Sequence, residues 1–372
     1  MAPLFVIFVN FGLILTRATA GKQRGSCYCN VGVCYKRSLD GTIVVCRTQE
    51  DFYGKSSNRE VSDDHKLKLP SRQQSTSPSS SVQPQATSLF GVPLYPIKFT
   101  HLQQQSNQLL LDIAEQELET ATCSDPAHNV WIGRRQAYAW NYTQAVQTYS
   151  RAIQTYADYA PLYRHRGHRY ITRRNFSLAE SDLAKAVKLM DKSKNEWEAD
   201  GQPNPYNIPL STLQFNSYYH LGLSRYLQGD YRAALAAYNS CYNFSYINDE
   251  SLQATAYWRY MTMRRLGINA TEANKSLSDI HAGMRTLDGS GYLNLTLMFQ
   301  GHRTPDEVLG PNPSPLDLVT VGYGVGNWYA INGMKDKAKE TFEKITNTSF
   351  WAGFGFIAAE ADLFRWEKGV SE

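Results

Sequence analysis

The chain has 372 residues, of which 42% are apolar and 12% aromatic, enough to bury a sizeable hydrophobic core. Its net charge is +4, from 38 basic and 34 acidic side chains. This balance excludes a protein that binds polyanions through its overall charge, so any basic surface must be local.

The N-terminus has the pattern of a secretory signal peptide. An apolar run over residues 4–15 is followed by Ala-Thr-Ala at residues 18–20, a small-x-small motif typical of signal-peptidase sites. We predict cleavage after Ala20, so that residues 1–20 are removed. The run is shorter than the roughly 20 residues that span a bilayer, and no later segment is long and apolar enough. We therefore expect an exported protein without a membrane span.

A small cysteine-rich module is predicted over residues 21–46. Its turn residues, Asp40 and Gly41, are flanked by strand-forming residues and predict a β-hairpin. Because the secretory pathway is oxidising, the four cysteines are expected to form two disulfides, with three possible connectivities. A zinc site is the alternative, although the cysteines are not spaced as C-x-x-C pairs. The four cysteines are Cys27, Cys29, Cys34 and Cys46.

The next segment, residues 47–88, is polar and ends in a run rich in Ser, Gln and Pro. Such a composition cannot bury enough apolar surface to offset the entropy of ordering. We predict a disordered linker.

From residue 127 onward the sequence repeats with a period of 34. The matching positions are Gly133, Tyr142, Ala145, Tyr149 and Ala152 in the first copy and Gly167, Phe176, Ala179, Leu183 and Ala186 in the second. This alternation of small and aromatic residues is the signature of the tetratricopeptide repeat (TPR), a pair of antiparallel helices. Small residues let two helices approach closely, and the aromatic residue fills the space between neighbouring pairs.

The predicted fold is therefore all-α, a TPR-like superhelix of helix pairs over residues 89–372. Two insertions interrupt the repeats, one of 21 residues after the second copy and a longer one before the last. The first helix of each pair should line the concave side. The repeats are expected near residues 127–160, 161–194, 216–249, 251–283 and 319–352, followed by a capping helix at 350–367.

The segments LYRHRGHRYITRRNFSLAESDLAKA, from Leu162, and GYGVGNWYAINGMKDKA, from Gly322, resemble a family of TPR proteins common in bacteria. The resemblance covers roughly residues 90–372 and leaves the cysteine module and the linker outside. It implies the helix-pair superhelix, and that family has no assigned biochemical activity.

Asn-x-Ser/Thr acceptors for N-glycosylation recur at fixed repeat positions. Three fall in the turn between the two helices of a repeat and two at the end of the second helix, where a bulky glycan does not disturb packing. Asn274 would lie inside a helix and should be used least. The predicted glycosylation sites are Asn141, Asn175, Asn243, Asn269, Asn294 and Asn347.

Arginine and histidine residues mark the concave face of the second repeat. Arg164 and His168 lie one helical turn apart, and Arg134 occupies the position equivalent to His168 in the first repeat. Arginine suits carboxylate and sulfate groups, so these residues predict an anion-recognition patch. The alternative is a solvated helix whose arginines pair with nearby acids. Further groove candidates at equivalent positions are Tyr219, Trp258, Tyr323 and Asn327.

Other chemistry is disfavoured. His165 and His168 have the spacing of metal ligands, but no third ligand is apparent and arginines flank them, so we expect no metal. No nucleic-acid-reading motif, cofactor loop or catalytic motif is present. Cys241 occupies a small buried position and is expected to be a free thiol, with a bridge to Cys123 disfavoured.

The sequence thus predicts a secreted, glycosylated and non-catalytic binding or scaffold protein. Its expected partner is an extracellular protein, a peptide or an anionic glycan on the concave face. Two alternatives stay open: a structural component of an extracellular matrix, and an enzyme that acts on an anionic substrate through Arg134, Arg164, His168 and Asn327. The oligomeric state does not follow from the sequence.

Overall fold

The computed structural model describes residues 82–121, 125–204, 206–287 and 289–369, together with three short strands between residues 27 and 46. By its internal contacts the chain divides into two units, one holding the strands and the other the helices from Val82 onward. The predicted signal peptide, most of the predicted linker and Cys123 lie outside the described residues.

The strand unit is a three-stranded antiparallel sheet of β1 (Cys27–Asn30), β2 (Val33–Arg37) and β3 (Ile43–Cys46). Strands β2 and β3 are the predicted hairpin, and β1 adds a strand that the turn pattern did not reveal. The register places Cys34 opposite both Cys29 and Cys46. The disulfide pairing stays a prediction.

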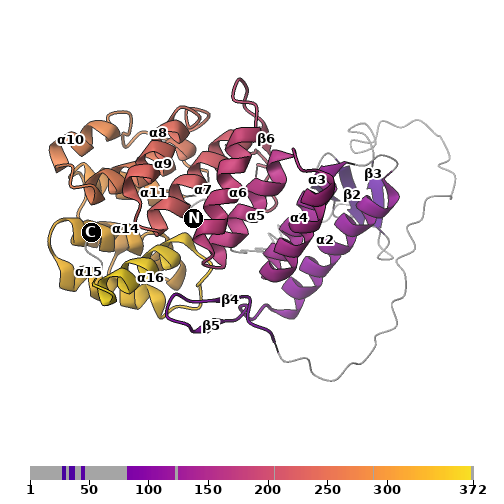
Figure 1. Ribbon diagram of the computed structural model, residues 1–372, viewed down its shortest axis with the longest axis horizontal. Coiled ribbons are helices and arrows are strands. Elements are labelled where there is room, and N and C mark those ends of the chain that lie inside the picture. Colours follow the sequence, from indigo (N-terminus) through magenta and orange to yellow (C-terminus); the bar gives the residue numbers. More distant parts are fainter. Residues whose placement is uncertain are drawn as a thin grey trace, which may run out of the picture. The chain divides into compact units, whose positions relative to one another are not determined.

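The helical unit is a series of antiparallel helix pairs (Figure 1). Because each predicted repeat coincides with two consecutive helices, the all-α superhelix is confirmed. The pairs are α3 (Pro126–Tyr138) with α4 (Tyr142–Thr155), α5 (Ala160–Thr172) with α6 (Phe176–Leu189), α7 (Leu213–Leu227) with α8 (Tyr231–Tyr242), α9 (Asp249–Arg265) with the short α10 (Ala270–Asn274) and η1 (Lys275–Leu277), and α14 (Gly322–Ile331) with α15 (Lys335–Thr346).

The remaining elements lie before, between and after the pairs. Helix α2 (His101–Thr120) precedes α3, and α16 (Phe354–Glu367) is the predicted capping helix. The second insertion forms α11 (Gly291–Phe299), α12 (Pro305–Leu309) and α13 (Pro315–Thr320). Short strand pairs are formed by β4 (Ala86–Thr87) with β5 (Pro93–Leu94) and by β6 (Trp197–Glu198) with β7 (Ser211–Thr212).

In four of the five repeats a glycine on the first helix lets the two helices touch. A Cβ atom added at Gly167 would lie 2.7 Å from Leu183 Cγ and 3.3 Å from the Ala179 carbonyl oxygen of the partner helix. We expect Gly167→Ala to lower the free energy of unfolding by about 1–3 kcal/mol, because Leu183 must move within a packed core. Urea unfolding of the variant measures the loss, and unchanged stability would contradict the close approach of α5 and α6.

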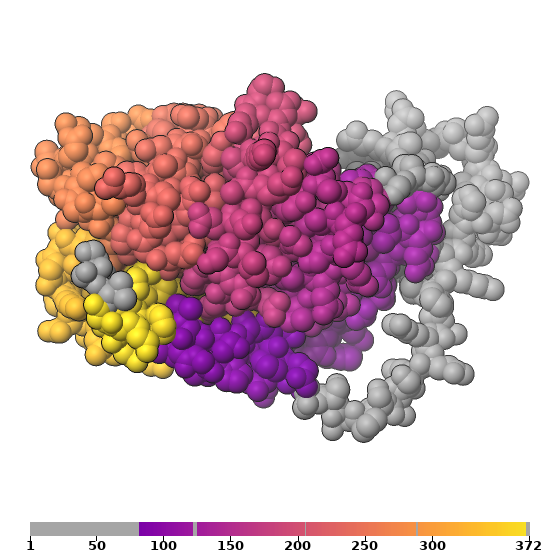
Figure 2. Space-filling view, in the orientation of Figure 1, coloured from indigo at the N-terminus to yellow at the C-terminus, as the bar shows by residue number. Residues whose placement is uncertain are grey.

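The N-terminal segment of the helical unit is described from Val82, and its first strand lies at Ala86–Thr87, within the last residues of the predicted linker. Strand β4 pairs with β5 in this segment, and polar contacts attach it to the repeats. The Gln85 side-chain oxygen accepts a bond from the Thr143 backbone N–H (3.1 Å), and its carbonyl accepts from Arg173 Nε (3.1 Å). The segment also lies against the C-terminal helices (Figure 2), where Leu89 N–H donates to Glu360.

The turns between the two helices of the first and second repeats each contain a residue with an unusual backbone conformation. Trp140 and Arg174, 34 residues apart, have φ values of 60° and 63°, whereas equivalent turns carry Gly229 and Gly333. A left-handed conformation costs a residue with a Cβ atom roughly 1–2 kcal/mol. Both side chains are buried against the C-terminal region: the Trp140 ring lies 5.1 Å from that of Trp351, and Arg174 binds Glu360 at 2.6 Å. These contacts offset the strain.

Helix α16 does more than cap the last repeat. It packs against α7 and α14 as well as α15. The Arg365 side chain donates to the Leu227 carbonyl at the end of α7 (2.7 Å), and the Phe354 ring lies 5.2 Å from that of His168. The predicted open groove is therefore wrong along α7 and α14, because the C-terminal helix of the same chain covers their inner sides.

The glycosylation acceptors lie where the repeat register places them. Asn141, Asn175 and Asn269 are the N-cap residues of α4, α6 and α10, whereas Asn243 and Asn347 are the C-cap residues of α8 and α15. Of these five, all but Asn141 are exposed, and glycosylation itself stays a prediction. The half-buried Asn274 ends α10, and the half-buried Asn294 lies within α11.

Candidate functional site

Four of the predicted groove residues form a buried hydrogen-bonded network. Trp258 Nε1 donates to Tyr219 Oη (2.7 Å), and the Trp258 and Tyr323 rings stack with centroids 5.9 Å apart. Asn327 Oδ1 accepts from Tyr226 Oη (3.3 Å). Tyr219, Trp258, Tyr323 and Asn327 are at most 2% exposed. They hold the helices together instead of lining the open surface that the sequence predicts for them.

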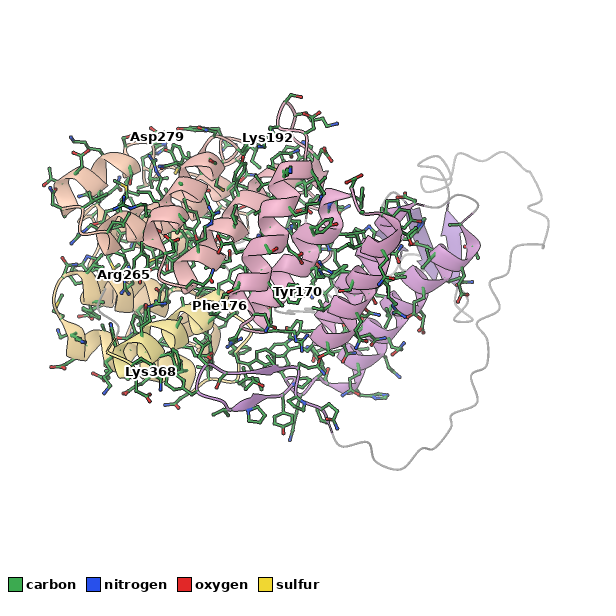
Figure 3. The ribbon with its side chains drawn as sticks, in the orientation of Figure 1. Tyr170, Phe176, Lys192, Arg265, Asp279 and Lys368 are labelled. Atoms are coloured by element: carbon green, nitrogen blue, oxygen red, sulfur yellow. The ribbon has the colours of Figure 1, made fainter. Side chains whose placement is uncertain are left out.

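The network ends on a buried ion pair between α9 and α16. Arg265 contacts Asp362 at 2.7 Å with both side chains fully buried, and Arg265 Nε donates to Asn327 (2.7 Å). Figure 3 marks the place of Arg265 in the fold. Tyr323 Oη donates to the same carboxylate (2.9 Å), and Arg365 also pairs with it. A carboxylate shared by two guanidinium groups and a phenol anchors α16 to the inner face.

The inner face of the first two repeats is different because it carries an arginine–histidine cluster, which we define as Arg134, Arg164, His165, His168 and Arg169. Helix α5 contributes all but Arg134, in two successive turns of one face. The four α5 side chains are buried, each between 6% and 8% exposed. Arginines are rarely this buried without a paired acid.

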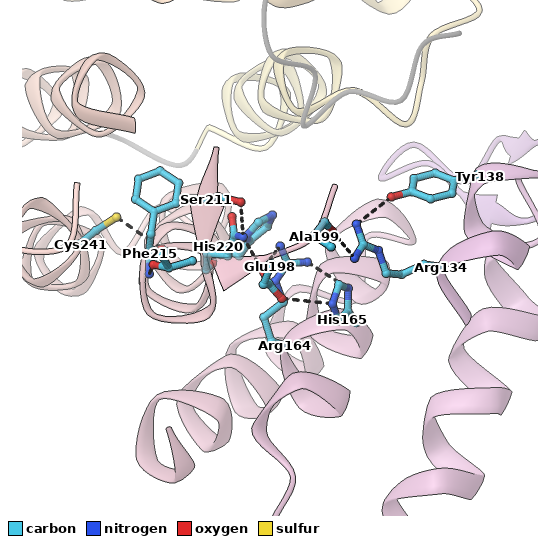
Figure 4. A network of polar contacts seen from close by, with 12 residues as sticks. Arg134, Tyr138, Arg164, His165, Glu198, Ala199, Ser211, Phe215, His220 and Cys241 are labelled. Atoms are coloured by element: carbon cyan, nitrogen blue, oxygen red, sulfur yellow. Dashed lines mark hydrogen bonds and ion pairs between the residues drawn. The ribbon is translucent and has the colours of Figure 1, made fainter. Parts of the chain in front are cut away.

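One carboxylate of the first insertion meets this cluster. Residues 195–204, which we call the strap, cross the inner sides of α3 and α5. Glu198 lies between Arg164 (2.9 Å) and His165 (3.2 Å), as Figure 4 shows. Arg134 donates to the Ala199 carbonyl oxygen (2.8 Å) and to Tyr138 Oη (3.1 Å). The strap is therefore held by the cluster.

The histidines of this region are neutral at pH 7. Arg164 donates to His165 Nδ1 (3.1 Å), so that nitrogen must lack a proton while Nε2 faces Glu198. Burial and the adjacent Arg164 lower the pKa of His165 to about 3. Burial and the nearby Arg169 hold the pKa of His168 well below the usual range. Burial and Arg164 do the same for His220. Burial alone would raise the pKa of Glu198, but Arg164 and His165 lower it.

No acidic side chain in the described part of the chain pairs with Arg169. Among the described residues its guanidinium makes no hydrogen bond or ion pair, and it lies 5.5 Å from the centroid of the Tyr142 ring. Burial lowers its pKa, and the charged or titratable groups that act on it most are three tyrosines and Arg134, with no carboxylate. Tyr142 Oη beside it also lacks a partner among the described residues. Hydrogen-bond donors therefore outnumber acceptors here.

Acid should destabilise the folded chain through these histidines. Their folded pKa values lie below the unfolded value of about 6.5, so the folded state binds fewer protons and stability is lost as the pH falls through 6.5. Between pH 6.5 and 5.5 the loss should be about 1 kcal/mol for each buried histidine. Glu198 does not contribute, because its ordinary titration lies below this window.

Urea unfolding across this pH range measures the effect. His168→Phe keeps an aromatic ring beside Phe354 and should reduce the slope, whereas replacing the exposed His302 by Phe should leave it unchanged. Equal slopes for all three proteins would contradict a neutral His168 in the folded state.

Sequence reasoning found part of this site. The structure brings Arg134, Arg164 and His168 into one cluster. Two of its members were not among the predicted site residues: Arg169, whose guanidinium has no acid partner in the described part of the chain, and Glu198 of the strap. Arg169 follows His168 on the same broad face of α5, which the spacing of the repeat already indicated. Glu198 belongs to an insertion, and no periodic pattern links an insertion to a particular helix.

Three further results concern metals, thiols and membranes. No three potential metal ligands cluster within the part of the chain that the structure describes. Cys241 is a buried free thiol, as predicted, and burial raises its pKa to about 12. Of the described helices, none has the length and apolar character that crossing a membrane requires.

The order of helix pairs, their 34-residue register and their glycine contacts together decide the architecture. The chain has a TPR-like fold. No protein-family model matches it, and no curated protein sequence matches it. Similar solved structures are TPR proteins of low identity.

Three of these structures show the extent of the similarity. A TPR protein from Parabacteroides merdae has 12% identity and a TM-score of 0.38, over 68% of this chain and 99% of its own. Part of a TPR-containing protein from Cytophaga hutchinsonii has 15% identity and a TM-score of 0.35, over 66% of this chain and 78% of its own. YrrB, described as a TPR protein with an unusual peptide-binding site, has 13% identity and a TM-score of 0.35, over 64% of this chain and 92% of its own. At these values the ligands of the three proteins are not transferable to this TPR-like chain.

Proposed function

We propose that this protein is a non-catalytic binding protein that holds an anionic group of its ligand at the arginine–histidine cluster. The observation that carries the proposal is Arg169, a guanidinium that is 6% exposed and has no acidic partner among the described residues. A buried unpaired charge costs several kcal/mol, so an anion at this position would be strongly favoured. The remaining donors of the cluster make the site suited to an oxyanion.

The chemistry of the cluster favours binding over catalysis. A general acid or base works best with a pKa near the working pH. The buried histidines have pKa values far below 7, and burial raises the pKa of Tyr142 and Tyr149. The cluster can therefore hold a negative charge without exchanging protons at neutral pH.

We further propose that the protein acts outside the cell as a glycosylated scaffold. The predicted signal peptide, the cysteine module and the exposed acceptors at helix ends support this. Glycans at the exposed Asn175 and Asn269 would occupy helix-pair turns and leave the cluster uncovered.

Thermal unfolding of the full chain in a panel of anions tests the proposed binding. Acetate, sulfate and phosphate are compared with chloride at equal ionic strength, in the wild-type protein and in Arg169→Met. At least one anion should raise the unfolding midpoint of the wild type, because a ligand that binds only the folded state stabilises it. An equal response of the variant to every anion would refute binding at Arg169.

A further inference from the structure

We infer that the ligand group at the cluster is a singly charged carboxylate, presented by a small molecule or by the end of a chain. This inference rests on the proposed function and specifies its ligand. Three observations lead to it: the charge count, the arrangement of donors and the cover over the site.

The first observation is the charge count. Arg134, Arg164 and Arg169 carry three positive charges, and the two strap acids that act on the first two, Glu198 and Asp200, carry two negative ones. Arg135, which donates to the Gly201 carbonyl of the strap (2.9 Å), lies outside the cluster and is not part of this count. With the histidines neutral, the cluster itself keeps one positive charge, that of Arg169. A monoanion cancels this charge, whereas a dianion such as sulfate would leave a buried negative charge, which is equally unfavourable.

The second observation is the arrangement of donors around Arg169. Its guanidinium offers a planar fork of N–H groups, and such a fork pairs with the two oxygens of a carboxylate in parallel. The Tyr142 hydroxyl and Arg164 Nε are buried without hydrogen-bond partners among the described residues. The Arg169 guanidinium lies 5.5 Å from the centroid of the Tyr142 ring, so this phenol is its close neighbour.

The third observation is that the site is covered from two sides. The strap is attached above the cluster by Glu198 and Ala199, and Phe354 at the start of α16 lies beside His168. Arg169 itself is 6% exposed. An acidic side chain in the middle of an extended peptide would have to bring its backbone past both covers. A free carboxylic acid or a C-terminal carboxylate brings only a small group.

The test uses the full-length protein and calorimetric titration with four probes at equal ionic strength. These are sodium acetate, sodium sulfate, an N-acetylated dipeptide with a free carboxyl terminus, and the same dipeptide as its amide. We expect acetate and the free acid to bind, and the amide and sulfate to bind at least about tenfold more weakly, because they lack the single charge. If the free-acid dipeptide binds more tightly than acetate, the carboxylate comes from the end of a chain. If acetate binds more tightly, it comes from a small acid.

Two variants complete the test. Arg169→Met should weaken acetate binding at least about tenfold, as expected for loss of a charge-assisted hydrogen bond. Arg166→Met, whose guanidinium binds Asp182 on α6 and takes no part in the cluster, should bind as the wild type does. Tighter binding of sulfate than of acetate, lost in Arg169→Met, would overturn the carboxylate inference and leave the proposed function standing. Absence of binding by acetate, sulfate and the free-acid dipeptide would overturn both.

Discussion

Asp362→Asn is expected to lower the free energy of unfolding by about 3–5 kcal/mol, the usual cost of breaking a buried ion pair from one side. The substitution keeps the shape of the side chain and removes its charge. Two guanidinium groups, those of Arg265 and Arg365, then lose their shared carboxylate, and Tyr323 loses its charged acceptor. Urea unfolding followed by circular dichroism measures the loss.

The matched control for this prediction is Asp336→Asn, in the first turn of α15, where the carboxylate is exposed. Its stability should stay within about 0.5 kcal/mol of the wild type, as is usual for surface substitutions. If Asp362→Asn proved as mild as this control, the ion pair would not be what fixes α16 to the inner face.

Arg169→Met, in contrast, is expected to raise the free energy of unfolding. In a buffer whose only anion is chloride, the variant should be about 1–3 kcal/mol more stable than the wild type, because a buried unpaired charge is replaced by an apolar side chain of similar length. Saturating acetate should narrow this difference by stabilising only the wild type. These two results together would mean that Arg169 lowers the stability of the free protein and serves to bind the ligand.

Arg166→Met is the comparison for that result. Arg166 Nε and Nη2 each bond to Asp182 at 2.7 Å, so its loss leaves a buried carboxylate without its partner and should destabilise the fold by about 1–3 kcal/mol. Two arginines of one helix should therefore respond with opposite signs. A clear loss of stability in Arg169→Met would show that Arg169 is paired in solution and would remove the basis of the proposed site.

The repeat architecture could be predicted from the sequence because it depends on local periodicity. Gly133 and Gly167 mark close approach of helices, and the acceptor asparagines mark the helix ends. The closure of the inner face could not be predicted in this way. It depends on contacts such as that between Arg174 and Glu360, which are 186 residues apart, and on insertions that interrupt the repeat.

The candidate site, too, could be predicted from the sequence only in part. The composition of α5 indicated a concentration of positive charge, and the repeat register indicated which side of the helix faces inward. Which arginine lacks an acid was decided by the strap, whose Glu198 reaches Arg164 and His165 but not Arg169. A periodic pattern identifies the face of a helix, whereas charge balance depends on every segment that packs on that face.

The left-handed turns at Trp140 and Arg174 bear on how the chain folds. An open solenoid has contacts only between neighbouring repeats, so it can form and lose repeats one at a time. Here the turns of the first two repeats are completed by Trp351 and Glu360 near the other end of the chain. Such distant pairings raise the contact order and slow folding, and they couple the first repeats to the last. The helical unit should therefore unfold in a single transition, unlike an open array.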